Sequence, residues 1–339
     1  EGFNKWAKAG LTVFLSYEYR NFALTDTTNI PGQRIINNYK ESSLSIGGEL
    51  SKKQGKLLHY NILGELAIAG EDAGQFSVEG RGDLNLRLFG DTVRLDVNAF
   101  IKNQNPVFYF RHFQSKHYWW DNNDLSKIMR TRLEGKLSLN RWGTQLRAGV
   151  ENIKNYTYLA NASIPVKDSE GNVTGFKNNA AVRQHSGNIQ IFTAMLQQKL
   201  KVGIFHLDGE VAYQKSSEQD ILPLPELSAY GNLYMKFGLA KKVLQIEMGA
   251  DVRYFSKYYA PDYSPVIGQF YNQNPDDKIE IGAFPIVNVY ANLHLKRTRF
   301  FIMMYHVNAG SGKSNYFLAP HYPINPRMIK FGLSWNFFD

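Results

Sequence analysis

The segment Met328–Asp339, with the sequence MIKFGLSWNFFD, indicates the fold of this chain most directly. Apolar side chains occupy every second position from Ile329 to Phe337, and polar residues or glycine occupy the positions between them. Because successive side chains of a β-strand point to opposite faces, this alternation predicts a strand with one apolar and one polar face. The apolar face ends in aromatic rings, as it does at the interfacial girdle of an outer-membrane β-barrel.

The same two-residue period recurs along the whole chain and predicts an all-β protein of about fourteen strands, within a range of about twelve to sixteen. At about 3.3 Å per residue and a tilt of about 40°, ten residues span roughly 25 Å, the height of the apolar band of a barrel. Before the last strand, the predicted segments are Leu11–Arg20, Leu44–Leu50, Leu58–Ile68, Phe76–Leu88, Val93–Lys102, Leu133–Leu139, Leu146–Val150, Ile189–Met195, Phe205–Tyr213, Leu227–Phe237, Leu244–Tyr254, Val287–Leu295 and Phe301–Val307.

The predicted connections alternate between short and long, as short periplasmic turns and long extracellular loops do. Short links are predicted at Lys52–Lys56, Gly90–Asp91, Arg141–Gly143, Val202–Gly203, Ala240–Lys242 and Lys296–Arg299. Between them come the modest link Gly70–Gly74 and the long links Thr25–Lys40, Asn103–Ser126, Asn155–Gly187, Lys215–Glu226, Lys257–Phe284 and Asn308–Arg327. We therefore predict that residues 1–339 form a single transmembrane, antiparallel, up-and-down β-barrel.

The composition is compatible with this fold and excludes several others. The 339 residues include no cysteine, which removes disulfide scaffolds and thiolate metal sites. No apolar run is long enough for a transmembrane helix, and the mean hydropathy of −0.37 suits a barrel whose strands are half polar. The net charge of +9 accompanies no nucleic-acid motif, so we expect no nucleic-acid partner.

The final third of the chain resembles the putative porin family of Bacteroidota outer membranes. The residues that carry the resemblance are Tyr258–Pro265, Gly268–Tyr271, Lys296–Phe301, His306–Gly310, Ala319–Pro323 and Pro326–Met328. The resemblance implies an outer-membrane β-barrel of a Gram-negative bacterium that acts as a porin. Members of this family tend to be longer, so we expect the C-terminal part of a longer protein or a processed form. The end of the chain, Phe338-Asp339, also departs from the terminal aromatic residue of many outer-membrane proteins.

The polar faces of the strands carry interleaved charges of both signs, which we expect to line the lumen. In an aqueous pore they would set the electrostatic filter. Alternatively they pair across strands and fill the interior, since eight strands enclose only side chains whereas sixteen leave a channel. We favour an open pore that is narrowed by loops. The predicted pore-lining residues are Arg81, Asp83, Arg87, Arg94, Asp96, Arg132, Glu134, Arg147, Glu151, Asp208, Glu210, Glu247, Asp251 and Arg253.

The predicted outer loop Val107–Asn123 is dense in aromatic and histidine side chains. Its functional interpretation is a stacking platform for sugar rings, or a constriction that folds into the lumen. The alternative, which we favour, is that the rings belong to strand extensions and either lie at the membrane interface or pack the loop against the rim of the barrel. The candidate residues for binding or constriction are Phe108, Phe110, Tyr118, Trp119 and Trp120.

No residue pattern indicates catalysis, a metal or a cofactor. His112 and His117 do not have the spacing of zinc ligands. His294 and His306 lie on neighbouring predicted strands and could approach each other, but no nucleophile motif accompanies them. The sequence Gly312-Lys313-Ser314 ends like a P-loop, yet it follows one predicted strand and leads to another, where a P-loop opens a helix.

We predict a passive-diffusion porin of the cell outer membrane, in contact with the lipid bilayer and lipopolysaccharide and permeable to small hydrophilic solutes. The alternative is a structural or accessory barrel with a plugged lumen in a larger outer-membrane complex. Either one is compatible with outer-membrane protein partners or a homo-oligomer. We disfavour a barrel enzyme, because it would need a nucleophile with its catalytic partners and the sequence shows no such motif. We also disfavour an energised importer, because no globular plug precedes Leu11 and the strand number is too low.

Overall fold

The computed structural model describes residues 9–26, 32–33, 35–55, 57–88, 90–313 and 315–337, so Lys56, Phe338 and Asp339 lie outside the described residues. Its main feature is one 14-stranded antiparallel sheet, which confirms the predicted strand number. In sheet order the strands are β1 (Gly10–Asp26), β2 (Ile35–Lys52), β3 (Leu58–Gly70), β4 (Phe76–Leu88), β5 (Asp91–Gln104), β8 (Ile128–Leu139), β9 (Thr144–Asn161), β12 (Ala180–Val202), β13 (Phe205–Ser216), β14 (Leu227–Leu239), β15 (Leu244–Phe255), β18 (Ile286–Leu295), β19 (Thr298–Tyr305) and β22 (Met328–Trp335).

The longer connections carry small elements that the sequence does not predict. They comprise helix α1 (Phe108–Arg111), the 3₁₀ helix η2 (Pro275–Asp277) and the two-stranded pairs β6 (His112–Gln114) with β7 (Trp119–Asp121), β10 (Ile164–Lys167) with β11 (Val173–Lys177), β16 (Asp262–Ser264) with β17 (Gln269–Tyr271), and β20 (Phe317–Ala319) with β21 (Tyr322–Pro323). A further 3₁₀ helix, η1 (Asn140–Trp142), forms a short turn. Within the described ranges, no helix has the length and apolar character needed to cross a membrane.

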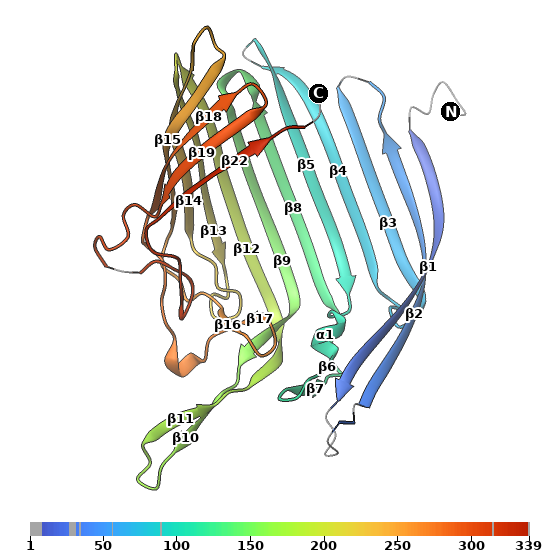
Figure 1. Ribbon diagram of the computed structural model, residues 1–339. Coiled ribbons are helices and arrows are strands. Elements are labelled where there is room, and N and C mark those ends of the chain that lie inside the picture. The colour runs from blue at the N-terminus through green and yellow to red at the C-terminus, as the bar shows by residue number, and fades with distance from the viewer. Residues whose placement is uncertain are drawn as a thin grey trace.

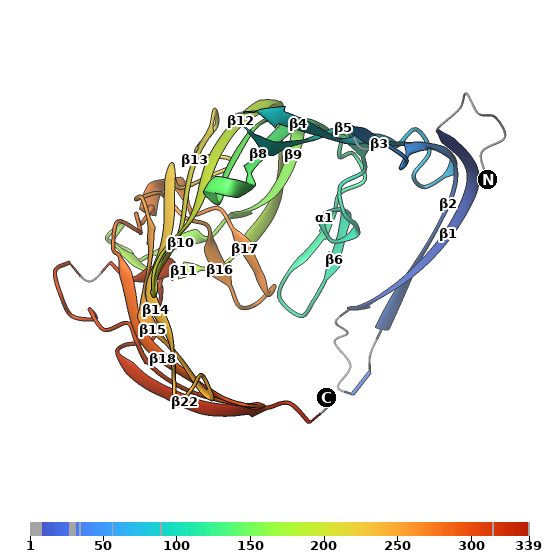
Figure 2. The same ribbon diagram turned by 90° about the horizontal axis from the view of Figure 1, so that it is seen from above.

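The large sheet curves around a central space (Figures 1 and 2). The end view in Figure 2 shows that α1, β6, β16 and β17 lie on the concave side of the sheet. β1 and β22 are the two edges of the sheet order, and no ladder between them is formed by the part of the chain that the structure describes. The connections that carry α1, β6, β16 and β17 lie at one open end of the curved sheet, which we call the mouth (Figures 1 and 2).

The strand register separates polar from apolar side chains. Leu133 of β8 lies opposite Val150 of β9, and Val150 lies opposite Phe192 of β12, so these three apolar side chains share one face. Arg132, one residue before Leu133, lies opposite Glu151 on the other face. Apart from register shifts between Leu44 and Ser45 of β2 and between His185 and Asn188 of β12, the pairing thus carries the alternation seen in each strand across the sheet.

The polar face is the concave one, because the connection after β5 reaches it. Arg111 of α1 contacts Glu41, a residue of the polar face of β2. The convex face is apolar and open to its surroundings, as the 74% exposure of Leu11 and the 81% exposure of Phe331 illustrate. An apolar surface of this extent is stable against lipid but not against water.

The alternation of connection lengths is as predicted, but several predicted boundaries are wrong. β1 continues to Asp26 and β2 already begins at Ile35, inside the predicted loop Thr25–Lys40. Likewise β9 continues to Asn161 and β12 begins at Ala180, inside the predicted loop Asn155–Gly187. Backbone pairing continues there although the polar–apolar alternation weakens, because the hydrogen bonds of a ladder join backbone groups whichever side chains the strand carries.

Glycines on the concave face leave room for aromatic rings of the neighbouring strand. Gly332 of β22 lies opposite Phe301 of β19, and a Cβ atom at Gly332 would come within 2.7 Å of that ring. Gly47 of β2 lies opposite Phe14 of β1 in the same arrangement. A ring that covers a glycine shields backbone that would otherwise be exposed and fixes the register of the pair.

Candidate functional site

All fourteen of the predicted pore-lining residues lie on the concave face. The register places Asp83 opposite Asp96 and Glu247 opposite Asn292 on that face, and the other members follow at two-residue intervals. They are Arg81, Asp83, Arg87, Arg94, Asp96, Arg132, Glu134, Arg147, Glu151, Asp208, Glu210, Glu247, Asp251 and Arg253. The structure therefore brings them together, and their role in lining a pore stays a prediction.

Many of these charges form ion pairs, either within one strand or between neighbouring strands. Arg94 Nε lies 2.8 Å from Asp96 Oδ1, and Lys136 Nζ lies 3.1 Å from Asp96 Oδ2. Arg130 Nη2 contacts Glu151 Oε1 at 2.5 Å. The arginine side chains remain accessible, however, with exposures of 50% for Arg94 and 73% for Arg81. Such exposed pairs contribute little to stability, and their charges remain accessible to solvent.

The two signs of charge are distributed unequally around the sheet. On the concave face of β4, β5, β8 and β9, eight basic residues outnumber five acidic ones: Arg81, Arg87, Arg94, Lys102, Arg130, Arg132, Lys136 and Arg147 against Glu79, Asp83, Asp96, Glu134 and Glu151. On β13, β14, β15 and β18, four acidic residues outnumber two basic ones: Asp208, Glu210, Glu247 and Asp251 against Lys236 and Arg253. These sectors lie on different sides of the central space (Figure 2).

A buried ion-pair cluster anchors the connection between β5 and β8 to the N-terminal strands. Arg111 donates from Nη2 to Glu41 Oε1 at 2.7 Å and from Nη1 to Glu71 Oε1 at 2.9 Å. Arg20 contacts the same Glu41 carboxylate from the other side at 3.2 Å and donates to Asp72 at 2.6 Å. The side chains of Arg111 and Glu41 are only 11% and 7% exposed, so this cluster is largely withdrawn from water.

Aromatic contacts support the same anchor. The ring of Phe108 is buried and stacks on Phe22 of β1 with a centroid distance of 3.7 Å. Tyr39 of β2 meets the edge of Phe108 at 5.4 Å and accepts a hydrogen bond from Gln114. Of the five aromatic candidates, Phe108 thus packs its loop against the strands, as the favoured interpretation of the loop holds. Tyr118 is also buried.

The connection after β15 is fixed to a different part of the sheet. The backbone N–H of Asn272 donates to the carbonyl of Leu159, and the N–H of Asn161 donates to the carbonyl of Asn272, both at 2.8 Å. The side-chain amide of Asn272 also donates to the carbonyl of Ile221 at 2.8 Å. β17 is therefore held beside the outer end of β9, opposite the anchored loop of α1, β6 and β7.

Between these two connections lies a cavity of about 590 Å³. Three segments supply its aromatic walls: the loop with Phe110 and Trp120, the end of β9 with Tyr156 and Tyr158, and β17 with Tyr271. None of the described residues that line this cavity carries a formal charge. Phe110 and Trp120 were among the sequence candidates, but the contributions of β9 and β17 carry no signal in the sequence because they depend on loop packing.

Trp119 and Trp120 are adjacent in sequence but point to different surroundings. Trp120 lines the cavity, stacks on Phe113 at 4.6 Å and donates from Nε1 to the carbonyl of Tyr109 at 2.9 Å. Trp119 is 63% exposed and is absent from the lining. Because side chains alternate along β7, only one of the two rings faces the cavity.

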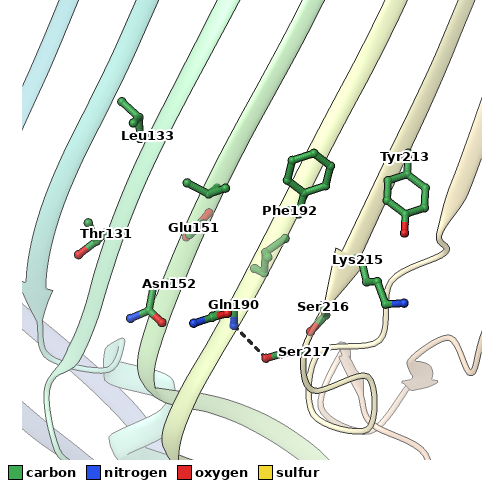
Figure 3. A pocket seen from close by; sticks show the side chains of 12 residues that line it. Thr131, Leu133, Glu151, Asn152, Gln190, Phe192, Tyr213, Lys215, Ser216 and Ser217 are labelled. Carbon is green, nitrogen blue, oxygen red and sulfur yellow. Dashed lines mark hydrogen bonds between the residues drawn. The ribbon is translucent and has the colours of Figure 1, made fainter.

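A second hollow, also of about 590 Å³, lies on the convex face (Figure 3). Leu133, Phe192 and Tyr213 form its apolar part. Gln190 and Lys215 lie nearer the end of the sheet that carries the long connections. On a lipid-facing wall, acyl chains would fill such a hollow, and the residues around it form no cluster suited to chemistry.

The described histidines do not belong to a cluster of potential metal ligands. No group of three or more potential ligands occurs in the ranges that the structure describes. The expectation that His294 and His306 could approach each other is wrong: His294 lies opposite Arg299 at the beginning of β19, whereas His306 follows the other end of β19. His306 is fully buried. Its Nδ1 atom lies 3.1 Å from the carbonyl oxygen of Asn325, and this contact holds the connection before β22 against the end of β19.

Comparison with known families decides which group of proteins the chain belongs to. The family model described as "Putative porin" matches residues 1–339, so the likeness extends well beyond the final third of the chain. The chain belongs to this family. Membership places this porin-family protein in the cell outer membrane, as predicted. No curated protein sequence matches the chain.

Solved structures of receptors and transporters share the fold of the porin-family protein. The siderophore receptor PirA from Acinetobacter baumannii matches with a TM-score of 0.63 and 10% identity, over 96% of this chain and 51% of that chain. The copper transporter OprC gives 0.63 and 12%, over 97% and 56%. A mutant of the ferric enterobactin receptor PfeA from Pseudomonas aeruginosa gives 0.60 and 13%, over 96% and 51%. The porin-family chain thus spans about half the length of these proteins, and the likeness concerns the fold alone.

Proposed function

We propose that this porin-family protein is a transmembrane β-barrel through which small hydrophilic solutes diffuse passively. The observation that carries the proposal is the separation of faces, with apolar side chains on the convex side and charged side chains on the concave side. A lipid-facing apolar wall around a polar interior is the arrangement of a membrane barrel. In this proposal residues 1–339 act as one barrel domain, in contact with the bilayer and lipopolysaccharide. An origin in Bacteroidota is supported by the sequence resemblance.

A membrane barrel also requires that no strand edge faces lipid. β1 and β22 are the edges of the strand order. Each unpaired backbone N–H or C=O group in the apolar part of a bilayer costs several kcal/mol. We therefore propose that the backbone N–H and C=O groups of β1 that point away from β2, and those of β22 that point away from β19, are hydrogen-bonded in the membrane.

The loops on the concave side supply the size filter. The anchor of Arg111 on Glu41 and the attachment of Asn272 to β9 hold two connections inside the mouth. A solute entering from this end must pass between them, so its cross-section decides whether it reaches the lumen. Both connections are held by several hydrogen bonds, and we therefore expect a constriction of fixed shape.

The charged walls supply the electrostatic filter. The sector from β4 to β9 carries an excess of basic side chains, and the sector from β13 to β18 carries an excess of acidic ones. A dipolar solute lowers its electrostatic energy when its negative end faces the first sector and its positive end faces the second. The walls thus orient polar solutes without strongly selecting one sign of ion. This activity needs no catalytic residue.

Cysteine labelling in membranes tests the proposal, because the native chain contains no cysteine. Asn98 of β5 faces the concave side, and the neighbouring Val97 faces the convex side. In intact outer-membrane vesicles, a water-soluble maleimide should label Asn98→Cys but not Val97→Cys, and a lipid-soluble probe should label only Val97→Cys. Equal labelling of the two variants by the water-soluble reagent would contradict a membrane-embedded wall.

A further inference from the structure

The cavity between the two inward connections differs in chemistry from the face beneath it. Its walls are aromatic and aliphatic side chains together with hydroxyl and amide groups, whereas the concave face of the strands is rich in charge. Its volume of about 590 Å³ lies within the range of roughly 300–1,000 Å³ that small-molecule pockets occupy. An uncharged lining would penalise a charged ligand, which would lose its hydration without gaining a counter-charge.

The aromatic walls are held in place before any ligand arrives. Trp120 is fixed by its hydrogen bond to the carbonyl of Tyr109 and by stacking on Phe113. Tyr156 and Tyr158 lie with their rings nearly parallel, at an interplanar angle of 8° and a centroid distance of 5.9 Å. Rings that are already ordered lose little conformational entropy on binding, which favours affinity.

Polar groups accompany the rings. Tyr156, Tyr158 and Tyr271 each bring a phenolic hydroxyl, and Gln269 brings a side-chain amide to the same cavity. Burial raises the pKa of Tyr271, so its hydroxyl stays protonated and can both donate and accept. The cavity thus combines flat apolar surfaces with neutral hydrogen-bonding groups.

We propose that this cavity is a binding site for a neutral sugar ring, which it captures at the mouth before passage. A pyranose ring presents C–H groups on its two faces, which pack on the flat surfaces of Trp120, Tyr156 and Tyr158, and hydroxyl groups at its rim, which match the phenolic hydroxyls and Gln269. The role in passage rests on the proposed channel function, but the binding itself does not.

Saturation-transfer difference NMR tests the binding without any transport measurement. The purified full chain in detergent would be mixed with glucose, galactose, cellobiose, xylobiose and indole, and the far-downfield amide protons of the protein irradiated, where neither the sugars nor the ring C–H protons of indole resonate. We expect saturation of the ring C–H protons of at least one sugar. Trp120→Ala should raise the dissociation constant of that sugar by at least about tenfold, which corresponds to a loss of roughly 1.4 kcal/mol of binding free energy.

Trp119→Ala is the matched control, because it removes the same side chain one position away from the cavity. It should leave the sugar affinity within about twofold of the native value. Trp120→Phe, which keeps an aromatic face, should retain more affinity than Trp120→Ala and so separates loss of the ring from loss of folding. Equal weakening in the Trp119 and Trp120 variants, saturation of indole alone, or no saturation with folded protein would overturn the sugar site. A channel that conducts without binding sugar would refute this inference alone, and sugar binding without conductance would refute only the channel.

Discussion

Replacing Arg111 should release the loop of α1, β6 and β7 from the N-terminal strands. Arg111 makes the hydrogen bond to Glu41 Oε1, and the described structure provides no hydrogen bond for the other oxygen of this buried carboxylate. Arg20 contacts Glu41 at 3.2 Å and would remain after the substitution. Arg111→Met keeps much of the side-chain volume while removing the charge and the donors, so it leaves Glu41 with a single charged neighbour.

The magnitude follows from this geometry. Removing one partner of a buried ion pair costs roughly 3–5 kcal/mol. Because Arg20 still faces Glu41 and water reaches the mouth, we expect about 2–3 kcal/mol for Arg111→Met. This change acts on the opening of the loop, since the strands beneath it keep their ladders. It corresponds to opening that is about 30–150 times more frequent.

Hydrogen exchange measured by mass spectrometry reports this opening directly. Peptides that include Asn122, whose N–H donates to the carbonyl of Arg111, should exchange about 30–150 times faster in Arg111→Met than in the native protein. Adding Glu41→Gln to Arg111→Met should slow the exchange again, because it removes the buried carboxylate charge that has lost one of its two basic partners. Arg94→Met, which removes an exposed pair elsewhere, serves as the control. Loop exchange within about twofold of native in Arg111→Met would refute the anchor.

Three further predictions concern other parts of the molecule. Gly332→Val should destabilise the β19–β22 pair by about 1–3 kcal/mol because its side chain meets the Phe301 ring, and a heat-modifiability assay on gels would detect the earlier unfolding. Hydrogen bonds, chiefly from the N–H of Asn172, lower the pKa of Asp168 below 3.8. Asp168 therefore stabilises the β10–β11 turn above its unfolded pKa, and this contribution is lost as pH falls through the lower folded pKa. Exchange of the Asn172 amide should accelerate there, and Asp168→Asn should remove this pH dependence. In bilayers, amides of β1 should exchange slowly at consecutive residues, whereas alternating fast exchange would indicate an unpaired edge.

The sequence predicts the sheet well because a sheet with one apolar and one polar face imposes the same alternation on every strand. The periodicity from Val93 to Lys102 is enough to place Arg94 and Asp96 on one face and Val97 on the other. The strand number and the alternation of turn lengths follow from repeating this reasoning along the chain. The alternation fails as a guide near some strand ends, as at Ile35, where the strand continues although polar and apolar side chains no longer alternate.

The loop cavity is predictable only in part. The density of aromatic residues around Trp120 marks the loop, but it does not reveal that Phe108 packs on Phe22 whereas Trp120 lines a cavity. That distinction depends on Glu41 and on β17, which are distant in sequence and are brought close by the curvature of the sheet. The partner of Arg111 likewise depends on tertiary packing, because each side chain in isolation looks like an ordinary surface charge.

Single-channel recording in a planar bilayer tests the central claim, an open and charged lumen, most directly. The native protein should give discrete current steps. Arg81→Glu, at an exposed position on the concave face, should shift the reversal potential in a salt gradient towards cation preference. Lys215→Glu, which changes charge by the same amount on the convex face, should leave the reversal potential unchanged. A silent bilayer that contains correctly folded protein, or equal shifts for the two variants, would contradict the account.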